Sequence, residues 1–178
     1  MEKQDSPEFS RPVAVETVKE EGAFAIEATP AERENLARRL GIVSVDRLSA
    51  DLRLRRQMGA MVRLEGEFAA EVTQACVVTL APVHSRIAAA VDRRYGPAEA
   101  LTETDAEDIS LEDEDPPEVL VGGVVDLGEA VSEQLALEID PFPRAEGAEF
   151  PGYSSGPEPV EKAKSPFAAL EDLLKKQK

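Results

Sequence analysis

Apolar and polar residues alternate over long stretches of the first half of the chain, with the period of two that is typical of β-strands. The clearest alternation runs from residue 42 to residue 55, and a second one follows from residue 62 to residue 72. Residues 57–60 lie between them, contain a glycine and fit a turn. Together the three segments predict a long β-hairpin.

Shorter extended patterns lie on both sides of this hairpin. Residues 11–18 and residues 23–28 each predict a strand. Residues 84–94 fit either a strand or a helix, and the apolar residues at every second position from 87 to 91 favour the strand. Residues 76–82 are apolar on both sides and end in proline, which predicts a buried connection.

A first helix is predicted by its end signals. Thr29 can accept a hydrogen bond from an exposed backbone amide, Pro30 suits the first helical position, and Glu32 completes a capping box. The helix should run to residue 40, because Gly41 is the residue type that commonly ends a helix.

A second helix is predicted to start at Asp126, with Glu129 as its capping partner. Its apolar residues share one side: Leu127, Val131 and Leu135 in a stripe, with Ala130 and Leu137 beside it.

Glycines near this helix do not form a phosphate-binding loop. No Gly-Lys-Ser/Thr sequence follows them, and Asp126 would repel a phosphate. We interpret Gly122 and Gly123 as a turn that interrupts a strand or hairpin over residues 119–125, and Gly128 as a helix packing position.

These elements predict one α+β domain in residues 1–144, with an antiparallel β-sheet core that could be barrel-like and is covered by short helices. Residues 96–118 hold ten acidic residues, too few large apolar groups to offset ordering entropy, and are expected to form an acidic mobile loop. Residues 145–165 are expected to be a linker, and residues 166–176 a short amphipathic helix.

Charge is distributed unevenly along the chain. The formal net charge is −16, and residues 96–143 contain fifteen acidic residues and no Lys or Arg. A chain of this charge is a poor indiscriminate binder of nucleic acid, because phosphate contacts need basic side chains. Direct RNA binding would therefore need a local basic face.

Arginines near the predicted hairpin offer such a face, since arginines two residues apart project from the same side of a strand. An ordinary solvated outer face, with these arginines paired to acids such as Glu65 and Glu67 across the hairpin, is the favoured explanation of the pattern. The candidate RNA contacts are Arg53, Arg55, Arg56, Arg86, Arg93 and Arg94.

Catalytic chemistry has little support in the sequence. The chain has one Cys and one His, Cys76 and His84, and Cys76 lies in an apolar run where a thiol is ordinarily an inert packing residue. A calcium site in the acidic loop would need ordered ligand spacing and a turn glycine, which are missing. We predict no catalytic residues, no cofactor and no metal.

The first residues are acidic and no segment reaches ~18 consecutive apolar residues, so we expect a cytoplasmic, soluble protein without membrane contact.

Two blocks, Gln74-Ala-Cys-Val-Val-Thr-Leu-Ala-Pro-Val83 and Val125-Asp-Leu-Gly-Glu-Ala-Val-Ser-Glu-Gln-Leu-Ala-Leu-Glu-Ile-Asp-Pro-Phe-Pro-Arg144, resemble the signature segments of the YceD-like family, the large ribosomal RNA subunit accumulation proteins. The ending Ser165-Pro-Phe-Ala-Ala-Leu170 resembles the family's C-terminal element. The positions that carry the resemblance are Cys76, Thr79, Leu80, Pro82, Asp126, Leu127, Gly128, Glu129, Leu135, Leu137, Pro141 and Pro143.

The resemblance implies a role in accumulation of the large ribosomal subunit and its RNA, with no catalytic residues to transfer. Many members have a second cysteine where this chain has Thr79, so no zinc site is expected here. The expected partner is pre-large-subunit rRNA or a basic ribosomal protein screened by the acidic loop, and not a small-molecule substrate. Direct RNA binding through the arginines and, last, a Cys76-dependent enzyme are the alternatives.

Overall fold

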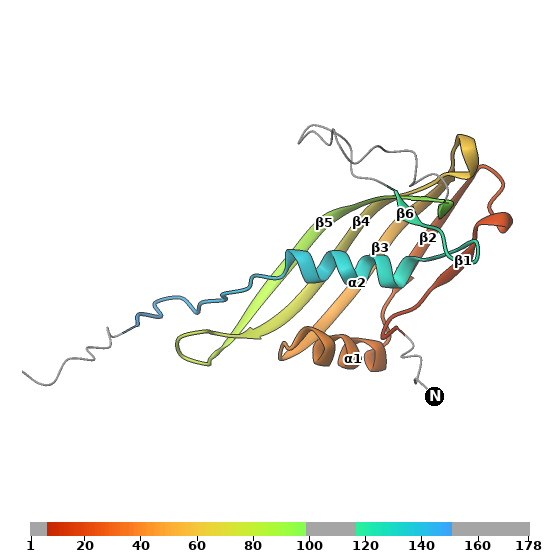
Figure 1. The fold of residues 1–178 in the computed structure, drawn as a ribbon. Coiled ribbons are helices and arrows are strands. Elements are labelled where there is room, and N and C mark those ends of the chain that lie inside the picture. Colours follow the sequence, from red (N-terminus) through yellow and green to blue (C-terminus); the bar gives the residue numbers. More distant parts are fainter. Residues whose placement is uncertain (1–6, 99–116, 151–178) are drawn as a thin grey trace, which may run out of the picture. The chain divides into compact units, whose positions relative to one another are not determined.

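The structure is a computed structural model that describes residues 7–98 and 117–150. The chain divides into two units, residues 1–148 and residues 149–178, and every element described below belongs to the first. The described residues form an α+β fold with a mostly antiparallel sheet, as the sequence predicted (Figure 1). In chain order the elements are β1 (Pro12–Ala14), η1 (Val15–Thr17), β2 (Glu21–Glu27), α1 (Pro30–Leu40), β3 (Ser44–Arg56), η2 (Met58–Ala60), β4 (Val62–Ala75), β5 (Pro82–Gly96), β6 (Glu118–Val119), β7 (Val124–Asp126) and α2 (Leu127–Glu138).

The main sheet has the order β2-β3-β4-β5-β6, with antiparallel neighbours from β2 to β5 and a short parallel pairing of β6 with β5. β1 and β7 form a separate two-stranded antiparallel sheet. Within residues 7–98 and 117–150 no pairing joins β2 to β6, so the sheet is open and the expected closure towards a barrel is not found.

The predicted hairpin is confirmed and is longer than expected. β3 and β4 pair along almost their whole length, with Leu54 opposite Leu64 and Ala50 opposite Phe68 on the apolar face. The turn between them contains Gly59 at a φ of 71°, a conformation that glycine adopts without steric cost. Residues 84–94 lie inside β5, so the strand reading of this segment is also confirmed.

The predicted strand over residues 11–18 is shorter than expected. Only Pro12–Ala14 is a strand, and the chain then turns through η1 before β2 begins.

Helix α1 begins and ends where its signals predicted. The Thr29 side chain accepts from the backbone amide of Glu32, and the Glu32 carboxylate accepts from the backbone amide of Thr29, which completes the capping box. Gly41 has a φ of 66° at the C-terminal cap. Arg11 holds this start in place through an ion pair of 2.6 Å with Glu32.

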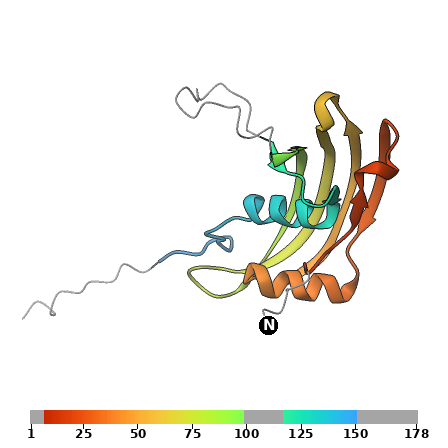
Figure 2. The ribbon, with the colours of Figure 1, turned by 45° about the vertical axis from the view of Figure 1, so that its right-hand side comes forward.

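Both helices contribute to one apolar core beneath the sheet, and Figure 2 shows α2 lying across one face of it. Leu36 of α1 and Leu127, Val131 and Leu135 of α2 are completely buried. Ala130 is buried as well, so the main stripe of the second helix is confirmed.

Three apolar residues were placed wrongly by the sequence. Leu137, expected beside the α2 stripe, is 75% exposed because it lies on the solvent side of the helix. Val77 and Leu80, expected in a buried connection, are 47% and 78% exposed, since residues 77–79 form the turn between β4 and β5. Only Cys76 of that run is fully buried.

Several predictions lie outside the described residues. These are the expected acidic loop except for its ends, the linker beyond residue 150, and the C-terminal helix over residues 166–176.

Candidate functional site

The two faces of the main sheet differ in what covers them. One face packs against the helices, and we call the other the outer face. Strand alternation gives the outer face a grid of short and charged side chains in cross-strand rows. Three neighbouring rows are Ala23-Arg53-Glu65-Asp92, Ala25-Asp51-Glu67-Ala90 and Glu27-Ser49-Ala69-Ala88.

The six arginines predicted as RNA contacts do not share one face. Arg53 and Arg55 lie on the outer face next to Glu21, and the Arg55–Glu21 pair measures 3.1 Å. Arg94 lies in the same row as Arg55, with Arg63 between them. Arg86 also lies on the outer face, but near the opposite end of β5.

The remaining two arginines lie on the other face. Arg56 pairs in register with the buried Val62, and Arg93 pairs with the buried Leu64. The Arg93 side chain is only 12% exposed and bonds Glu133 of α2. Burial by itself lowers the pKa of Arg93, but the bond to Glu133 and the charge of Glu118 outweigh it and raise that pKa. Arg93 therefore fastens α2 to the sheet.

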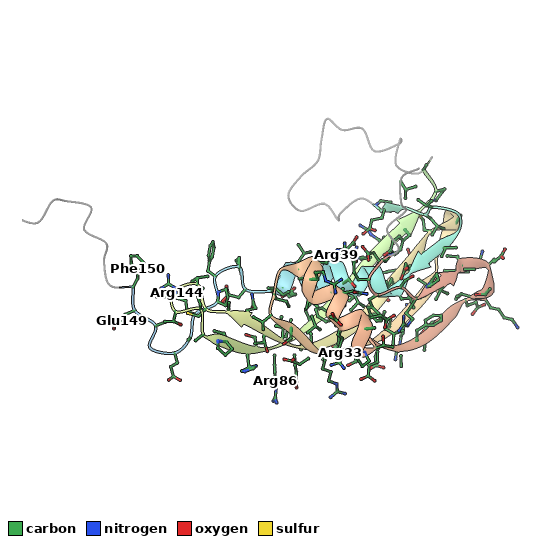
Figure 3. The ribbon with its side chains drawn as sticks, turned by 90° about the horizontal axis from the view of Figure 1, so that it is seen from below. Arg33, Arg39, Arg86, Arg144, Glu149 and Phe150 are labelled. Carbon is green, nitrogen blue, oxygen red and sulfur yellow. The ribbon has the colours of Figure 1, made fainter. Side chains whose placement is uncertain are left out.

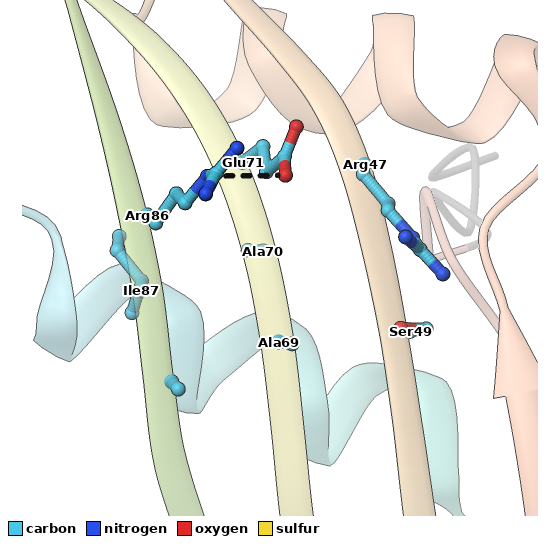
Figure 4. A pocket seen from close by; sticks show the side chains of 8 residues that line it. Arg47, Ser49, Ala69, Ala70, Glu71, Arg86 and Ile87 are labelled. Carbon is cyan, nitrogen blue, oxygen red and sulfur yellow. Dashed lines mark ion pairs between the residues drawn. The ribbon is translucent and has the colours of Figure 1, made fainter.

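A hollow on the outer face has a volume of about 330 Å³ (Figure 4). Its floor is the short side chains of Ser49, Ala69 and Ala88, and the next row bounds it with Arg47 on β3 and Arg86 on β5.

The charges on this hollow are mostly basic. Glu71 lies between the two arginines and pairs with Arg86 at 3.4 Å. The Arg86 side chain is 87% exposed, and Figure 3 shows it projecting in the same direction as Arg33 of α1. Arg47 makes no hydrogen bond or ion pair with any residue that the structure describes. The row has two arginines and one glutamate, so its net charge is positive.

Arg47 was not among the predicted residues. A β-bulge between Val45 and Arg47 shifts the register of β3 against β4. The signal was present in the sequence as the break in alternation between Val45 and Leu48.

A second hollow on the outer face is larger, about 760 Å³, and is lined by charges of both signs. Asp51 and Glu67 lie directly opposite each other across β3 and β4, a like-charge arrangement that costs stability. Gly66 allows the strands to approach closely here, since a Cβ at this position would lie 2.2 Å from the backbone oxygen of Asp51.

The two blocks that resemble family signatures meet in space. The backbone amide of Val77 donates to the carbonyl of Pro143 at 2.9 Å, and the Gln74 side chain donates to the carbonyl of Asp140 at 2.8 Å. The amide of Ala145 donates to the Cys76 Sγ at 3.3 Å. The signature residues thus hold the β4–β5 turn against the segment after α2.

Cys76 is the centre of this junction. Its buried sulfur also accepts from the backbone amides of Val78 and Thr79, both at 3.4 Å. The amide of Ala145 and the bonds from Thr79 stabilise the thiolate and lower the pKa of Cys76 to about 6. The bonds to the sulfur come from backbone amides and not from His84, whose Nδ1 lies 2.8 Å from the Thr73 hydroxyl.

The start of α2 explains another part of the signature. The Asp126 carboxylate accepts from the amides of Gly128 and Glu129, and also from the amide of Arg11 at 2.7 Å. A Cβ at Gly128 would lie 2.5 Å from the carbonyl oxygen of Phe9, so only glycine lets this segment pack on the helix. The reading of Gly128 as a packing position is confirmed.

The other signature positions divide between the core and the surface. Leu127, Leu135 and Pro143 are buried, whereas Thr79, Leu80, Pro82, Leu137 and Pro141 are exposed. Glu129 pairs with Arg39 of α1 at 2.9 Å.

In the part of the chain that the structure describes, no three His, Cys, Asp or Glu side chains are grouped closely enough to hold a metal ion. No helix among the described residues is long and apolar enough to cross a membrane.

Comparison with known proteins gives one match. The family model described as "Large ribosomal RNA subunit accumulation protein YceD" matches residues 64–174, which include both signature blocks and the Ser165–Leu170 ending. No curated protein and no solved structure matches significantly. The chain belongs to the YceD family of large ribosomal RNA subunit accumulation proteins.

Proposed function

We propose that this protein is a non-catalytic, cytoplasmic factor that promotes accumulation and assembly of the large ribosomal subunit and its rRNA. The observation that carries the proposal is the family match, which covers both signature blocks and the segment that joins them. The partner is pre-large-subunit rRNA or a basic ribosomal protein that binds it.

The roles of the signature residues support a non-catalytic function. Asp126 caps a helix, Gly128 permits close packing, and Leu135 fills the core. Cys76 has the most reactive side chain among the signature residues, but its sulfur is buried and surrounded by backbone amides. A nucleophile needs an accessible thiolate and a partner base, which this arrangement does not supply.

Direct RNA contact is the second candidate, and the Arg47-Glu71-Arg86 row favours it. Glu71 lies between the two arginines and pairs with Arg86, so the guanidinium of Arg47 is available to bind a phosphate. The small residues on the floor of the hollow leave room for a nucleic acid strand to approach. The paired Arg53, Arg55 and Arg93 are poorer candidates than the sequence alone indicated.

The primary test is deletion of the gene, followed by gradient sedimentation and quantification of large-subunit rRNA. A complementing tagged copy shows where the protein migrates. Selective loss of large-subunit material, with the tagged protein on its precursors, is the expected result. Normal subunit profiles with the tagged protein running free would overturn the proposal.

Complementation with variants separates the two kinds of partner. The double variant Arg47→Ala, Arg86→Ala should weaken RNA binding. If both arginines contact phosphates, the slope of log K against the logarithm of the salt concentration should become smaller in magnitude by about 1 to 2. Arg38→Ala is the matched control, because Arg38 is an exposed arginine on α1. If the partner is a basic protein, deletion of residues 99–118 should impair function more than the double arginine variant.

A further inference from the structure

Strand β2 is one edge of the main sheet, and the short strand β6 lies at the other edge (Figures 1 and 2). It spans Glu21–Glu27 and pairs only with β3. An unpaired strand edge presents a row of backbone donors and acceptors to any extended segment that approaches it.

The backbone groups available on this edge follow from the ladder. The amide of Arg56 donates to the carbonyl of Glu20, and the amide of Ala28 donates to the carbonyl of Leu48. Bonded and non-bonded pairs alternate in an antiparallel ladder, so the even-numbered residues of β2 bond to β3. The amides and carbonyls of Glu21, Ala23, Ala25 and Glu27 therefore point away from the sheet.

Apart from the charged Glu21 and Glu27 at its ends, the edge lacks the features that usually protect such strands. β2 contains no Pro and no Lys, and its register with β3 shows no bulge. Within the described residues, one bond caps an outward group: Arg11 donates to the carbonyl of Glu27 at 3.1 Å. The neighbouring Ala23 and Ala25 side chains are small and exposed, so a new strand would meet no steric obstacle on the outer face.

The side chains on the core side of β2 would gain from such a strand. Phe24 and Ile26 pack against the apolar core but are only partly buried. An apolar residue on an added strand would lie beside them and cover the part of each that faces solvent.

Charge indicates whether a second copy of β2 or a segment of a partner protein would pair with this edge. Two copies of β2 pairing over their full length would place Glu21 of each against Glu27 of the other, and like charges directly opposite are destabilising. Glu27 has no ion pair with a described residue, so its side chain is available to a partner, and Glu16 and Glu20 add further acid nearby. Glu21 is already paired with Arg53 and Arg55, so the charge of an added strand matters most beside Glu27, where a basic residue complements the edge.

We infer that the β2 edge accepts an extended, basic segment of a partner protein as an additional antiparallel strand. Main-chain hydrogen bonds to Ala23 and Ala25 supply most of the binding, and a basic side chain beside Glu27 sets the preference. The inference is independent of whether the outer face contacts RNA.

The test uses the full-length chain, labelled with ¹⁵N, and two capped synthetic peptides. One is Lys-Val-Thr-Val-Thr-Val-Lys, which matches β2 in length, and the other carries Glu at both ends instead. Titration followed by NMR should shift the β2 amides and protect Ala23 and Ala25 from hydrogen exchange with the basic peptide. The acidic peptide should bind about tenfold more weakly at low salt.

Two variants test the mode of binding. Ala25→Pro removes an outward amide that the monomer does not use, and it should lower affinity for the basic peptide by about tenfold or more, whereas Ala25→Ser keeps the amide and should bind normally. Glu27→Lys should reduce the difference between the peptides about fivefold or more, and this variant leaves the backbone unchanged if Ala25→Pro folds poorly.

Three results would overturn the inference. They are equal binding of both peptides, normal binding by Ala25→Pro, and protection of the Ala23 and Ala25 amides in the free chain. The last would mean that the edge is already occupied, by a second copy or by another segment of this chain, and sedimentation velocity would distinguish these.

Discussion

The two faces of the sheet are built from the same strands but differ in what their residues do. On the covered face Leu48, Leu54 and Leu64 are fully buried under the helices. On the outer face the corresponding rows carry Ser, Ala and charged residues, and some of the charges pair across neighbouring strands, as Arg86 does with Glu71. Alternation along each strand produces both faces at once.

The buried part of the family signature holds the packed side of the molecule together. Asp126, Gly128 and Cys76 each hold one segment against another through backbone contacts. These signature residues therefore report how the fold is held together, and the outer face and the β2 edge are surfaces that they do not reach.

The largest change in stability should come from removing a buried side chain on the covered face. Leu135→Ala removes a completely buried side chain from the core between α2 and the sheet, and it should reduce the free energy of unfolding by about 2–5 kcal/mol. Leu137→Ala is the control in the same helix, since Leu137 is 75% exposed and should change stability by less than about 0.5 kcal/mol. Urea unfolding followed by circular dichroism measures both, and similar values for the two variants would contradict the assignment of the α2 faces.

Close packing at the start of α2 gives the next effect. Gly128→Ala adds a Cβ that would lie 2.5 Å from the Phe9 carbonyl oxygen, so residues 9–11 must move away at a cost of about 1–3 kcal/mol. Ala136→Ser is the matched control, because it adds one heavy atom at an exposed position of the same helix. A stabilised Gly128→Ala variant, as helix propensity alone would predict, would show that the N-terminal segment does not pack here.

Local signals made much of this fold predictable. Thr29, Glu32 and Gly41 fixed both ends of α1, because caps act within one turn of the helix. Alternation from Leu48 onwards made the β3–β4 hairpin predictable, since a slip by one residue would turn every apolar side chain outward.

What could not be predicted depends on distant neighbours. Leu137 fits the apolar stripe of α2 in the sequence pattern. In the structure Leu135 is buried in the core, whereas Leu137 faces solvent. Arg93 resembles Arg55 in sequence, yet one lies under α2 and the other in solvent, because strand parity decides the face. The contact of Cys76 with Ala145 joins segments 69 residues apart, and no local pattern encodes it.

Charge on the packed side should stabilise the fold in a pH-dependent way. Arg11 and the amide of Thr29 bond the Glu32 carboxylate and lower its pKa from 4.5 to about 2. A lowered folded-state pKa means that the stabilisation is complete above the unfolded pKa, near 4.5, and is lost as the pH falls through about 2. Glu32→Gln should therefore cost about 1 kcal/mol at pH 7 and less at pH 3, measured by urea unfolding. A cost that stays constant between these pH values would rule out the charged pair as its source.

Removing the charge of Glu67 on the outer face should stabilise the protein, whereas removing the charge of Glu32 should destabilise it. This should be the smallest of the predicted effects. Asp51 and Glu67 lie directly opposite each other across β3 and β4, and neither forms an ion pair with a described residue. Glu67→Gln removes the repulsion while it keeps the shape of the side chain, so it should stabilise the protein by about 0.2–1 kcal/mol at low salt. The gain should fade in 1 M NaCl, because the Debye length falls to about 3 Å. Thermal unfolding at two salt concentrations measures both effects, with Gln57→Glu as a control that adds a charge at the exposed turn. A destabilised Glu67→Gln variant would mean that Glu67 is already engaged, and the outer face would then resemble the packed side in using its charges to hold the fold together.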